Sequence, residues 1–329
     1  MLNERLMRAL RQIPALDQPS ALHFVQCSSA LATGAIILHG FVARETTARV
    51  VVKTARNPEL PHSLEREWRS LALVRGDATL AELTPAGIAT FHVDDMRFFA
   101  YSGVPGRTMA TAFRNRIWLP RAALLSRFAA RALEMALVVH RPASRPAPAA
   151  AVAEDLVADL DWLRRSVPLL PQSVSRKGHE AADVIANSSK PLPNGRVHGD
   201  FSPHNLMVES NARRGATRII DWEHMEPDRP QHLDIFRFIG ASLLLGKRGA
   251  ERGIALQSMR RDAGPFVNAL LRPWLGAMGA DADAWTRLER LEALWWQYWI
   301  HATRRELERH ASADARDSVL LRSLVSAVE

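Results

Sequence analysis

Hydrophobic positions come in short β-prone runs over the first hundred residues and follow helical spacing over most of the remainder. The runs between residues 21 and 54 predict three strands, and residues 86–93 and 96–101 predict two more around a turn at Asp94. Residues 64–74 carry apolar side chains at helical spacing and predict a helix between these groups of strands. The first part of the chain is therefore expected to form a five-stranded sheet with one helix.

The second part of the chain alternates long helical patterns with Pro- and Gly-rich breaks. Residues 119–139 and 151–165 predict helices, whereas residues 166–195 are rich in turn formers and are expected to be irregular before a strand at Arg196. Residues 283–310 predict a C-terminal helix with four tryptophans. We expect these to lie in the core, although part of the helix can instead line a binding pocket. They are Trp285, Trp295, Trp296 and Trp299.

One segment places three oxygen-bearing side chains at fixed offsets. Asp200 and Asn205 are five residues apart, and Asp221 follows sixteen residues after Asn205. Apolar runs at 206–208 and 218–220, joined by a polar connection, predict a hairpin. Its most symmetric register sets Asn205 opposite Asp221, and facing residues of an antiparallel pair lie only about 5 Å apart at Cα. Because Mg²⁺ takes a few such oxygens together with phosphates, this pattern predicts a phosphoryl-transfer site.

A phosphoryl-transfer site also needs a strand Lys near the phosphates and a helix Glu that holds it. A β-branched run ends in Lys53, one of only four lysines in a chain with 39 arginines. Fourteen residues later, Glu67 borders the apolar stripe of the predicted helix, with Glu65 as the alternative. The loop expected to cover the phosphates, residues 27–35, contains a single glycine, Gly34, so nucleotide contacts there are open.

The sequence motif His-Gly-Asp-x-x-x-x-Asn, followed by Ile-Asp-Trp-Glu, resembles the motifs of the aminoglycoside phosphotransferase and choline kinase-like family. The resemblance implies an α+β, two-lobed protein-kinase-like fold. Its N-terminal lobe, residues 1–103, would hold a five-stranded antiparallel sheet plus helix and bind the nucleotide. Its mostly helical C-terminal lobe, residues 104–329, would carry catalysis and the acceptor.

The same resemblance implies roles for individual residues. Asp200 would act on the acceptor hydroxyl, and Asn205 and Asp221 would bind Mg²⁺. Asp234 would brace the catalytic loop from the following helix. Lys53, Glu67 and Gly34 would serve the phosphates of ATP or GTP. The adenine would meet backbone groups of the hinge, namely Phe99, Tyr101 and Gly103.

Composition narrows the protein class. The chain has 329 residues, 47% of them apolar and 24% charged, which is typical of a globular protein. Its single Cys27 excludes an internal disulfide, and no apolar run of about 18 residues predicts a membrane span. Without a secretory segment, the cytoplasm is the expected location. The oligomeric state is not readable from the sequence.

Charge is uneven along the chain. Of the net charge of +8, residues 106–329 hold +7, densest between Lys247 and Arg261. Since no nucleic-acid motif accompanies these arginines, which alternate with acids, nucleic-acid binding is not expected. Because the C-terminal lobe carries this positive charge, we expect a neutral or anionic acceptor rather than a polycationic one.

We therefore predict an ATP- or GTP-dependent phosphotransferase that acts on a small-molecule hydroxyl. A metal-dependent phosphoesterase is one alternative, because six metal-capable side chains are close in sequence; it requires the histidines to converge and leaves Lys53 without a role. A non-catalytic binding protein that keeps the fold is the other, and nucleotide turnover would separate it from an enzyme. The six side chains are His198, Asp200, His204, Asp221, His224 and His232.

Overall fold

The structure is a computed structural model that describes residues 2–14, 16, 22–27, 35–55, 62–114, 121–209, 217–243, 245, 264–309 and 319–326. The chain divides into two compact units. The first comprises Met1–Ala112 and His204–Met225, and the second comprises Phe113–Pro203 and Glu226–Glu329. Each unit is described by itself below. Among the described residues, no helix is both long and apolar enough to cross a membrane.

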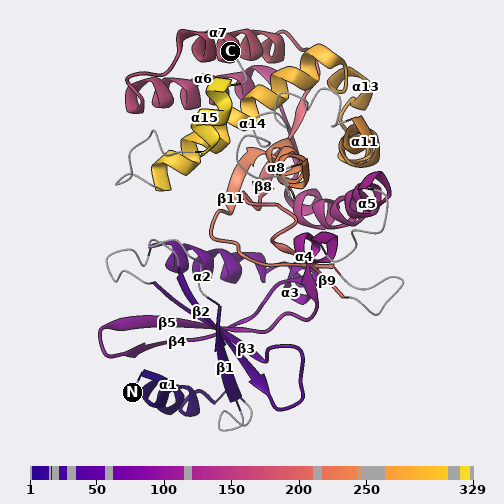
Figure 1. Cartoon of the computed structure of the whole chain (residues 1–329). Coiled ribbons are helices and arrows are strands. Elements are labelled where there is room, and N and C mark those ends of the chain that lie inside the picture. Colours follow the sequence, from indigo (N-terminus) through magenta and orange to yellow (C-terminus); the bar gives the residue numbers. More distant parts are fainter. Residues whose placement is uncertain are drawn as a thin grey trace. The chain divides into compact units, whose positions relative to one another are not determined.

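A five-stranded antiparallel sheet forms the centre of the first unit (Figure 1), in the order β1-β2-β3-β5-β4. The strands arise where the β-prone runs predict them, and the turn between the last two has Asp94 at φ 53°, a left-handed conformation that aspartate tolerates. The strands are β1 (Leu22–Gln26), β2 (Ala35–Val42), β3 (Val50–Ala55), β4 (Gly87–Val93) and β5 (Met96–Ser102).

Alternation along these strands gives the sheet two different faces. On one face, Val50 and Val52 pack in a cluster with Leu6 and Leu10 of helix α1 (Leu2–Arg11), a helix that the strand pattern did not include. The other face carries Lys53 and, in register with it, Phe99. Helix α2 (His62–Val74) serves this second face, where Trp68 contacts the rings of Phe99 and Tyr101. The polar side chains that matter for chemistry are therefore on the α2 face.

The first unit also contains a small three-stranded sheet that includes the predicted hairpin. Its strands are β6 (Arg107–Thr108), β9 (Leu206–Val208) and β10 (Thr217–Ile219). Helix α3 (Ala78–Leu83) begins at Asp77, whose carboxylate accepts from the backbone N–H groups of Thr79 and Leu80. Helix α4 (Met109–Arg114) follows β6 directly.

The hairpin register predicted from symmetry is wrong by one residue. Leu206 pairs with Ile219, so Asn205 lies opposite Ile220 rather than Asp221, and the Ile220 N–H donates to the Asn205 carbonyl at 3.0 Å. The cause is the connection between the strands, residues 209–216, which has an even number of residues and whose centre falls between two of them. Such a slip changes the side-chain partners along the ladder.

Helices dominate the second unit, together with a three-stranded sheet in the order β11-β8-β7. The strands are β7 (Arg145–Ala147), β8 (Leu192–Val197) and β11 (Glu226–Pro230). The α-helices with the longest spans are α5 (Arg121–His140), α6 (Ala149–Ser166), α7 (Gln172–Ala186), α8 (His232–Leu243) and α14 (Leu288–Arg309). Shorter helical segments are η2 (Arg141–Ala143), α11 (Gly264–Phe266), η3 (Val267–Leu271), α12 (Arg272–Ala277), α13 (Ala282–Trp285) and α15 (Val319–Ser326).

Helix α7 corrects the expectation that residues 166–195 are irregular. Its buried face consists of Val174, Gly178, Ala181 and Ile185, which recur at helical spacing. An added Cβ at Gly178 would lie 2.8 Å from a Leu160 methyl group, so the missing side chain allows close packing on α6. The sequence pattern was missed because small residues supply this face in place of large apolar ones.

The tryptophans of the predicted C-terminal helix are divided between two elements, because α13 ends at Trp285 and α14 begins at Leu288. Trp285 is fully buried, and Trp299 is largely buried. Trp295 contacts the rings of both Phe236 and Trp299. Trp285 and Trp299 lie in the core, as predicted, whereas Trp295 and Trp296 are half-buried. Helix α14 supplies other side chains to a cavity described below.

Candidate functional site

Lys53, Glu67 and Asp221 meet within the first unit. Lys53 Nζ donates to both carboxylate oxygens of Glu67, each at 2.8 Å, and lies 3.3 Å from Asp221 Oδ1. Strand β3 supplies the lysine and helix α2 supplies Glu67, whose side chain is only 2% exposed. Asp221 follows β10 and is 35% exposed. The predicted lysine–glutamate pair is therefore formed, with Glu67 and not Glu65 as the partner.

Charge keeps this lysine protonated. Burial by itself lowers the pKa of Lys53, but the Glu67 and Asp221 carboxylates outweigh burial and raise it above its usual value. The Lys53 ammonium also lies 5.6 Å from the centre of the Tyr101 ring, a cation–π contact. Glu65 forms a separate ion pair with Arg97 at 2.6 Å, which explains why it is not available to Lys53. One ammonium thus faces two carboxylates.

Asp221 adopts an uncommon backbone conformation. Its φ is 69°, in the left-handed region that non-glycine residues seldom occupy. Such conformations persist where the surroundings impose them, and they gather at functional sites. The Ile220–Asn205 backbone bond places Asn205 beside the start of this turn, so an amide and a carboxylate come from adjacent positions of the hairpin's open end. This oxygen donor set suits Mg²⁺.

The predicted hinge residues lie along β5 and just after it. Strand β5 pairs with β3 and β4 at both Phe99 and Tyr101, so the backbone groups of these residues lie inside the sheet. The Gly103 N–H donates to the Arg49 carbonyl at 3.0 Å, and a Cβ at Gly103 would lie 1.6 Å from the Ala48 carbonyl oxygen. Glycine is thus required where the chain leaves the strand. Gly34 lies outside the described residues.

In the second unit, Asp234 holds the loop that carries Asp200. It is fully buried on α8 and accepts from the backbone N–H groups of His198, at 2.6 Å, and Gly199, at 2.9 Å. His140 Nε2 lies 3.0 Å from the same carboxylate, and Trp274 Nε1 donates to His140 Nδ1. Since tryptophan only donates, His140 must carry its proton on Nε2 and donate it to Asp234. The predicted bracing role of Asp234 is confirmed.

These donors determine the protonation of Asp234. Burial alone would raise the pKa of its carboxyl group, but the His140 hydrogen bond and the loop N–H groups hold it below its usual value. Asp234 therefore stays ionised, and its carboxylate oxygens are occupied by hydrogen bonds from the loop and from His140. The Asp200 N–H in turn donates to His198 Nδ1 at 3.2 Å, so the histidine of the motif supports the loop rather than presenting a metal ligand there.

Asp200 itself is paired with an arginine that the sequence motifs did not include. Arg237 Nε donates to Asp200 Oδ1 at 2.6 Å, and the Arg237 guanidinium also contacts the Tyr298 hydroxyl. The Asp200 carboxylate raises the pKa of Arg237 above its usual value. Arg237 stands one helical turn after Asp234 on α8, a charge among mostly buried apolar positions. That isolated charge is the sequence signal that would have identified it.

A small cavity adjoins Asp200 within the second unit. Its volume is about 40 Å³, and Asp200 and Asp234 are the acids among its described lining residues. Helix α14 supplies one wall through Tyr298, His301 and Arg305, which confirms that part of the C-terminal helix lines a pocket. None of these α14 residues was predicted.

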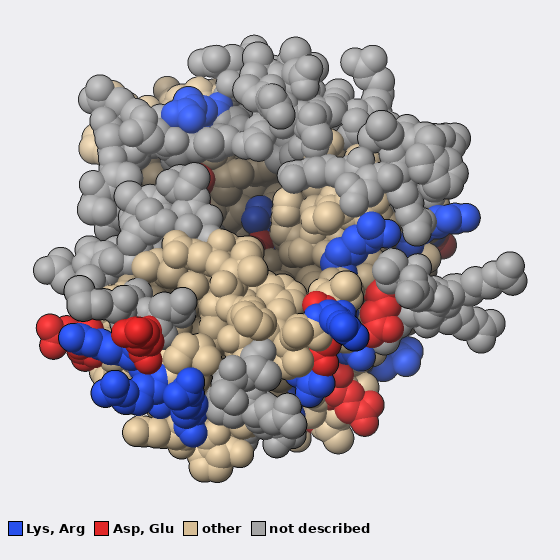
Figure 2. All heavy atoms as spheres, turned by 60° about the horizontal axis from the view of Figure 1, so that its bottom comes forward, with Lys and Arg blue, Asp and Glu red and all other residues tan. Residues whose placement is uncertain are grey.

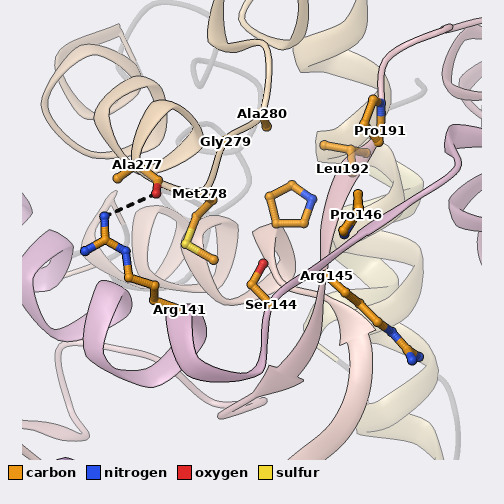
Figure 3. A pocket seen from close by; sticks show the side chains of 11 residues that line it. Arg141, Ser144, Arg145, Pro146, Pro191, Leu192, Ala277, Met278, Gly279 and Ala280 are labelled. Carbon is orange, nitrogen blue, oxygen red and sulfur yellow. Dashed lines mark hydrogen bonds between the residues drawn. The ribbon is translucent and has the colours of Figure 1, made fainter.

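Another hollow of the second unit, shown in Figure 3, lies away from the predicted site residues. Pro146, Pro191 and Leu192 line it together with Arg141 and Arg145. Arg141 donates to the Ala277 carbonyl, and Arg145 pairs with Asp228 at 2.5 Å. This hollow supplies none of the acid–base groups that phosphoryl transfer needs.

The histidines of the motif region serve separate local roles. His232 is fully buried and pairs with Gln297 at 2.9 Å, and His224 contacts Glu223 at 2.8 Å. In the part of the chain that the structure describes, no three His, Cys, Asp or Glu side chains gather as a metal cluster would require. The arrangement that a two-metal phosphoesterase needs is not formed by these residues.

Surface charge among the described residues is mixed. On the face seen in Figure 2, blue and red side chains lie next to each other. Exposed ion pairs of opposite charge occur in both units, for example Arg5–Asp94 and Arg176–Glu180. The dense basic stretch between Lys247 and Arg261 lies outside the described residues.

Comparisons with known proteins agree with the motifs. The model of the phosphotransferase enzyme family matches residues 39–233, more than half of the chain. No curated protein sequence matches. Two solved structures are similar in fold at low identity, an APH(2")-IIia complex with GDP and kanamycin and a glucosamine kinase.

The APH(2")-IIia structure has a TM-score of 0.57 and 15% identity, and the match covers 100% of this chain and 97% of that one. The glucosamine kinase has a TM-score of 0.50 and 16% identity, with 98% and 81% covered. At this identity the likeness establishes the fold. Together with the five-stranded sheet and the helical second unit, it confirms the predicted kinase-like α+β fold.

Proposed function

The chain belongs to the phosphotransferase enzyme family, and on that premise we propose that it moves the γ-phosphate of ATP, or of GTP, to a hydroxyl of a small molecule. The observation that carries this proposal is the Lys53 cluster, in which one ammonium is fixed 2.8 Å from Glu67 and 3.3 Å from Asp221. A kinase requires such a lysine for its phosphates. The two similar structures were solved with GDP and kanamycin in one case and named a glucosamine kinase in the other.

In this proposal Lys53 binds the nucleotide phosphates. Glu67 already fixes the Lys53 ammonium by two hydrogen bonds, so the lysine side chain loses little conformational freedom when the phosphates bind. The Glu67 side chain is almost completely buried and cannot serve the ligand directly. We assign Phe99, Tyr101 and Gly103 to the nucleotide as the hinge, with backbone contacts confined to groups that the sheet leaves available, and Gly34 to the phosphate loop.

Asn205 and Asp221 would hold Mg²⁺, because they offer an amide and a carboxylate oxygen from neighbouring positions of the hairpin end. When bound, the ion would neutralise charge on the phosphates. Asp221 also faces the Lys53 ammonium, and the partly exposed carboxylate is open to a ligand on its other side. The uncommon φ of Asp221 directs its side chain in a manner that an extended strand residue would not.

Asp200 would orient the acceptor hydroxyl and take its proton. The Asp234 carboxylate fixes the preceding loop through two backbone N–H groups, so Asp200 begins the reaction in one position. The domain assignment follows: residues 1–103 serve the nucleotide, and residues 104–329 serve catalysis and the acceptor.

The proposal is tested by a transfer screen of the purified protein with γ-labelled ATP and GTP against pooled hydroxyl compounds, in parallel with Asp200→Asn. Labelled product from the wild type and its loss in the variant support the proposal. Nucleotide binding without any turnover would favour a non-catalytic binding protein. Hydrolysis of phosphate esters without transfer would favour a phosphoesterase.

A further inference from the structure

We propose that the cavity beside Asp200 is a subsite for a carboxylate on the acceptor, with Arg237 as the residue that selects it. The inference rests on the proposed function, because it names the kind of hydroxyl compound that the enzyme phosphorylates. It depends on three observations within the second unit: the pairing of Arg237, the lack of an available acid in the cavity, and the cavity's size.

Arg237 is fixed in place on two sides. Its Nε donates to Asp200 Oδ1 at 2.6 Å, and Tyr298, which is almost fully buried, contacts the same guanidinium. A guanidinium has five N–H donors in a planar fork, and the fork matches two oxygens of a carboxylate. The Nε bond to Asp200 and the Tyr298 contact use part of the fork, and the remaining terminal N–H donors form the edge that a carboxylate would meet. An acceptor carboxylate on that edge would lie next to the hydroxyl that Asp200 orients.

The acids of the cavity are already engaged. Asp234 accepts from two loop N–H groups and from His140, and Asp200 is paired with Arg237. Arg305, the other cavity arginine, pairs with Glu226 at 2.9 Å. An ammonium group brought into this cavity would therefore meet arginines without an unengaged carboxylate among the described lining residues. A carboxylate would meet the Arg237 fork.

Size limits the occupant further. The cavity measures about 40 Å³, far below the roughly 300–1,000 Å³ of pockets that enclose a whole small-molecule ligand. Such a space receives a single small group of the acceptor and not the whole molecule. A planar carboxylate is smaller than a phosphate group, so the carboxylate is the anion that the subsite fits.

The test uses two sets of hydroxyl compounds that differ in one group. The three-carbon set is glycerol, serinol, glycerate and glycerol 3-phosphate; the hexose set is glucose, glucosamine, glucuronate and glucose 6-phosphate. Each set thus contains a neutral, a cationic, a carboxylate and a phosphate member. Phosphorylation by the full-length protein is measured as kcat/KM, and binding is measured in parallel by thermal shift with a non-hydrolysable ATP analogue and Mg²⁺.

We expect the carboxylate member of at least one set to exceed its neutral partner by roughly tenfold or more, since the loss of one charged hydrogen bond typically changes binding by that order. Arg237→Gln should abolish the preference, mainly through KM, and Arg237→Lys should restore it only in part because the fork is lost. Arg145→Gln removes an equal charge from the hollow of Figure 3 and should leave the preference unchanged.

A preference for the neutral, cationic or phosphate member, or a carboxylate preference that survives Arg237→Gln, would overturn the inference while the phosphotransferase assignment stands. Absence of transfer to every compound would count against the proposed function instead. In that case the thermal shifts decide the subsite: a carboxylate-specific shift that disappears in Arg237→Gln supports it, and the lack of such a shift overturns it.

Discussion

The Lys53 cluster and the Asp200 loop each hold two carboxylates and one cation, but the partners are distributed differently. In the first unit one ammonium is shared by Glu67 and Asp221. In the second unit Asp200 is paired with Arg237, and Asp234 is satisfied by neutral N–H donors. The first arrangement suits a divalent metal ion at Asp221, with the Lys53 ammonium beside it for the anionic phosphates. The second suits a neutral or anionic group.

The role of an aspartate cannot be read from its residue type alone, because it depends on the partners of the carboxylate. Three aspartates of one motif region have different partners. Asp200 pairs with an arginine and Asp221 with a lysine, whereas Asp234 accepts hydrogen bonds from loop N–H groups and a histidine. In the proposed function these partners accompany three separate tasks, namely orientation of a hydroxyl, metal binding and support of the loop. Substitutions at these three positions should therefore fail in three distinguishable ways.

The largest effect is expected from Asp200→Asn. The loss of its base or orienting function should lower the transfer rate by about 10²–10⁴-fold, with Mg·ATP affinity largely unchanged. Asp221→Asn should instead weaken Mg·ATP binding itself. Calorimetric titration of both variants, with rate measurements, separates them. If Asp200→Asn abolishes binding and Asp221→Asn spares it, the two roles are reversed and the charge comparison fails.

Lys53→Ala should lower phosphoryl transfer by about 10²–10³-fold, the usual cost of removing one preorganised charge from a transferring group. Lys53→Arg should not restore it, because the planar fork does not fit the position between Glu67 and Asp221. Steady-state rates at several Mg·ATP concentrations measure the loss. Lys190→Arg, at an exposed lysine paired with Asp281, is the matched control. Wild-type turnover in either Lys53 variant would contradict the kinase mechanism.

Asp234→Ala should cost about 3–5 kcal/mol of unfolding free energy, because it removes a buried charge and leaves its donors unpaired. Asp228→Ala removes an exposed carboxylate whose pair with Arg145 is solvated, and it should cost no more than about 1 kcal/mol. Urea unfolding of both variants measures the difference. Equal losses would show that Asp234 does not hold the loop as its hydrogen bonds indicate.

A smaller effect is expected from pH. Burial lowers the pKa of His232 to about 4, so the folded protein binds this proton less readily than the unfolded chain, whose histidine titrates near 6.5. Stability should therefore be full above pH 6.5 and decline as pH falls toward 4, by up to roughly 3 kcal/mol from this residue. His232→Gln should flatten that dependence in guanidinium unfolding measured at pH 7 and 4.5. An unchanged slope would show that His232 is not kept neutral.

The parts that could be predicted from sequence are those in which one element carries a strong local pattern. The Lys53–Glu67 pair followed from a β-branched strand and a nearby amphipathic helix, and both form where expected. The hairpin register was missed by one residue, because the symmetry of two apolar runs does not fix which residues pair.

Other features depended on packing between distant segments. Helix α7 was missed because three of its five buried residues are Gly178, Ala181 and Ala182, which carry little hydrophobic signal in the sequence. Gly178 reveals its role only when Leu160 is seen against it. Arg237 was missed because its partner Asp200 is 37 residues away in sequence; the charge on an otherwise apolar helix marks Arg237 itself but not its partner. The periodicity of apolar residues along the sequence does not predict tertiary contacts of this kind.

Helix α14 gives the enzyme a simple route to new acceptors. The cavity wall takes Tyr298, His301, Ala302 and Arg305 from it, positions that recur every three or four residues and so form one stripe along the helix. On another side the helix is anchored in the core, where Ile300 and Thr303 are fully buried. Tyr298 and His301 are buried and bonded, to Arg237 and Asp159, so these two residues tie the cavity wall to the core. Ala302 and Arg305 are less buried. If the proposed function holds, these two positions are where the cavity wall can diverge during evolution, or be redesigned, at least cost to the fold.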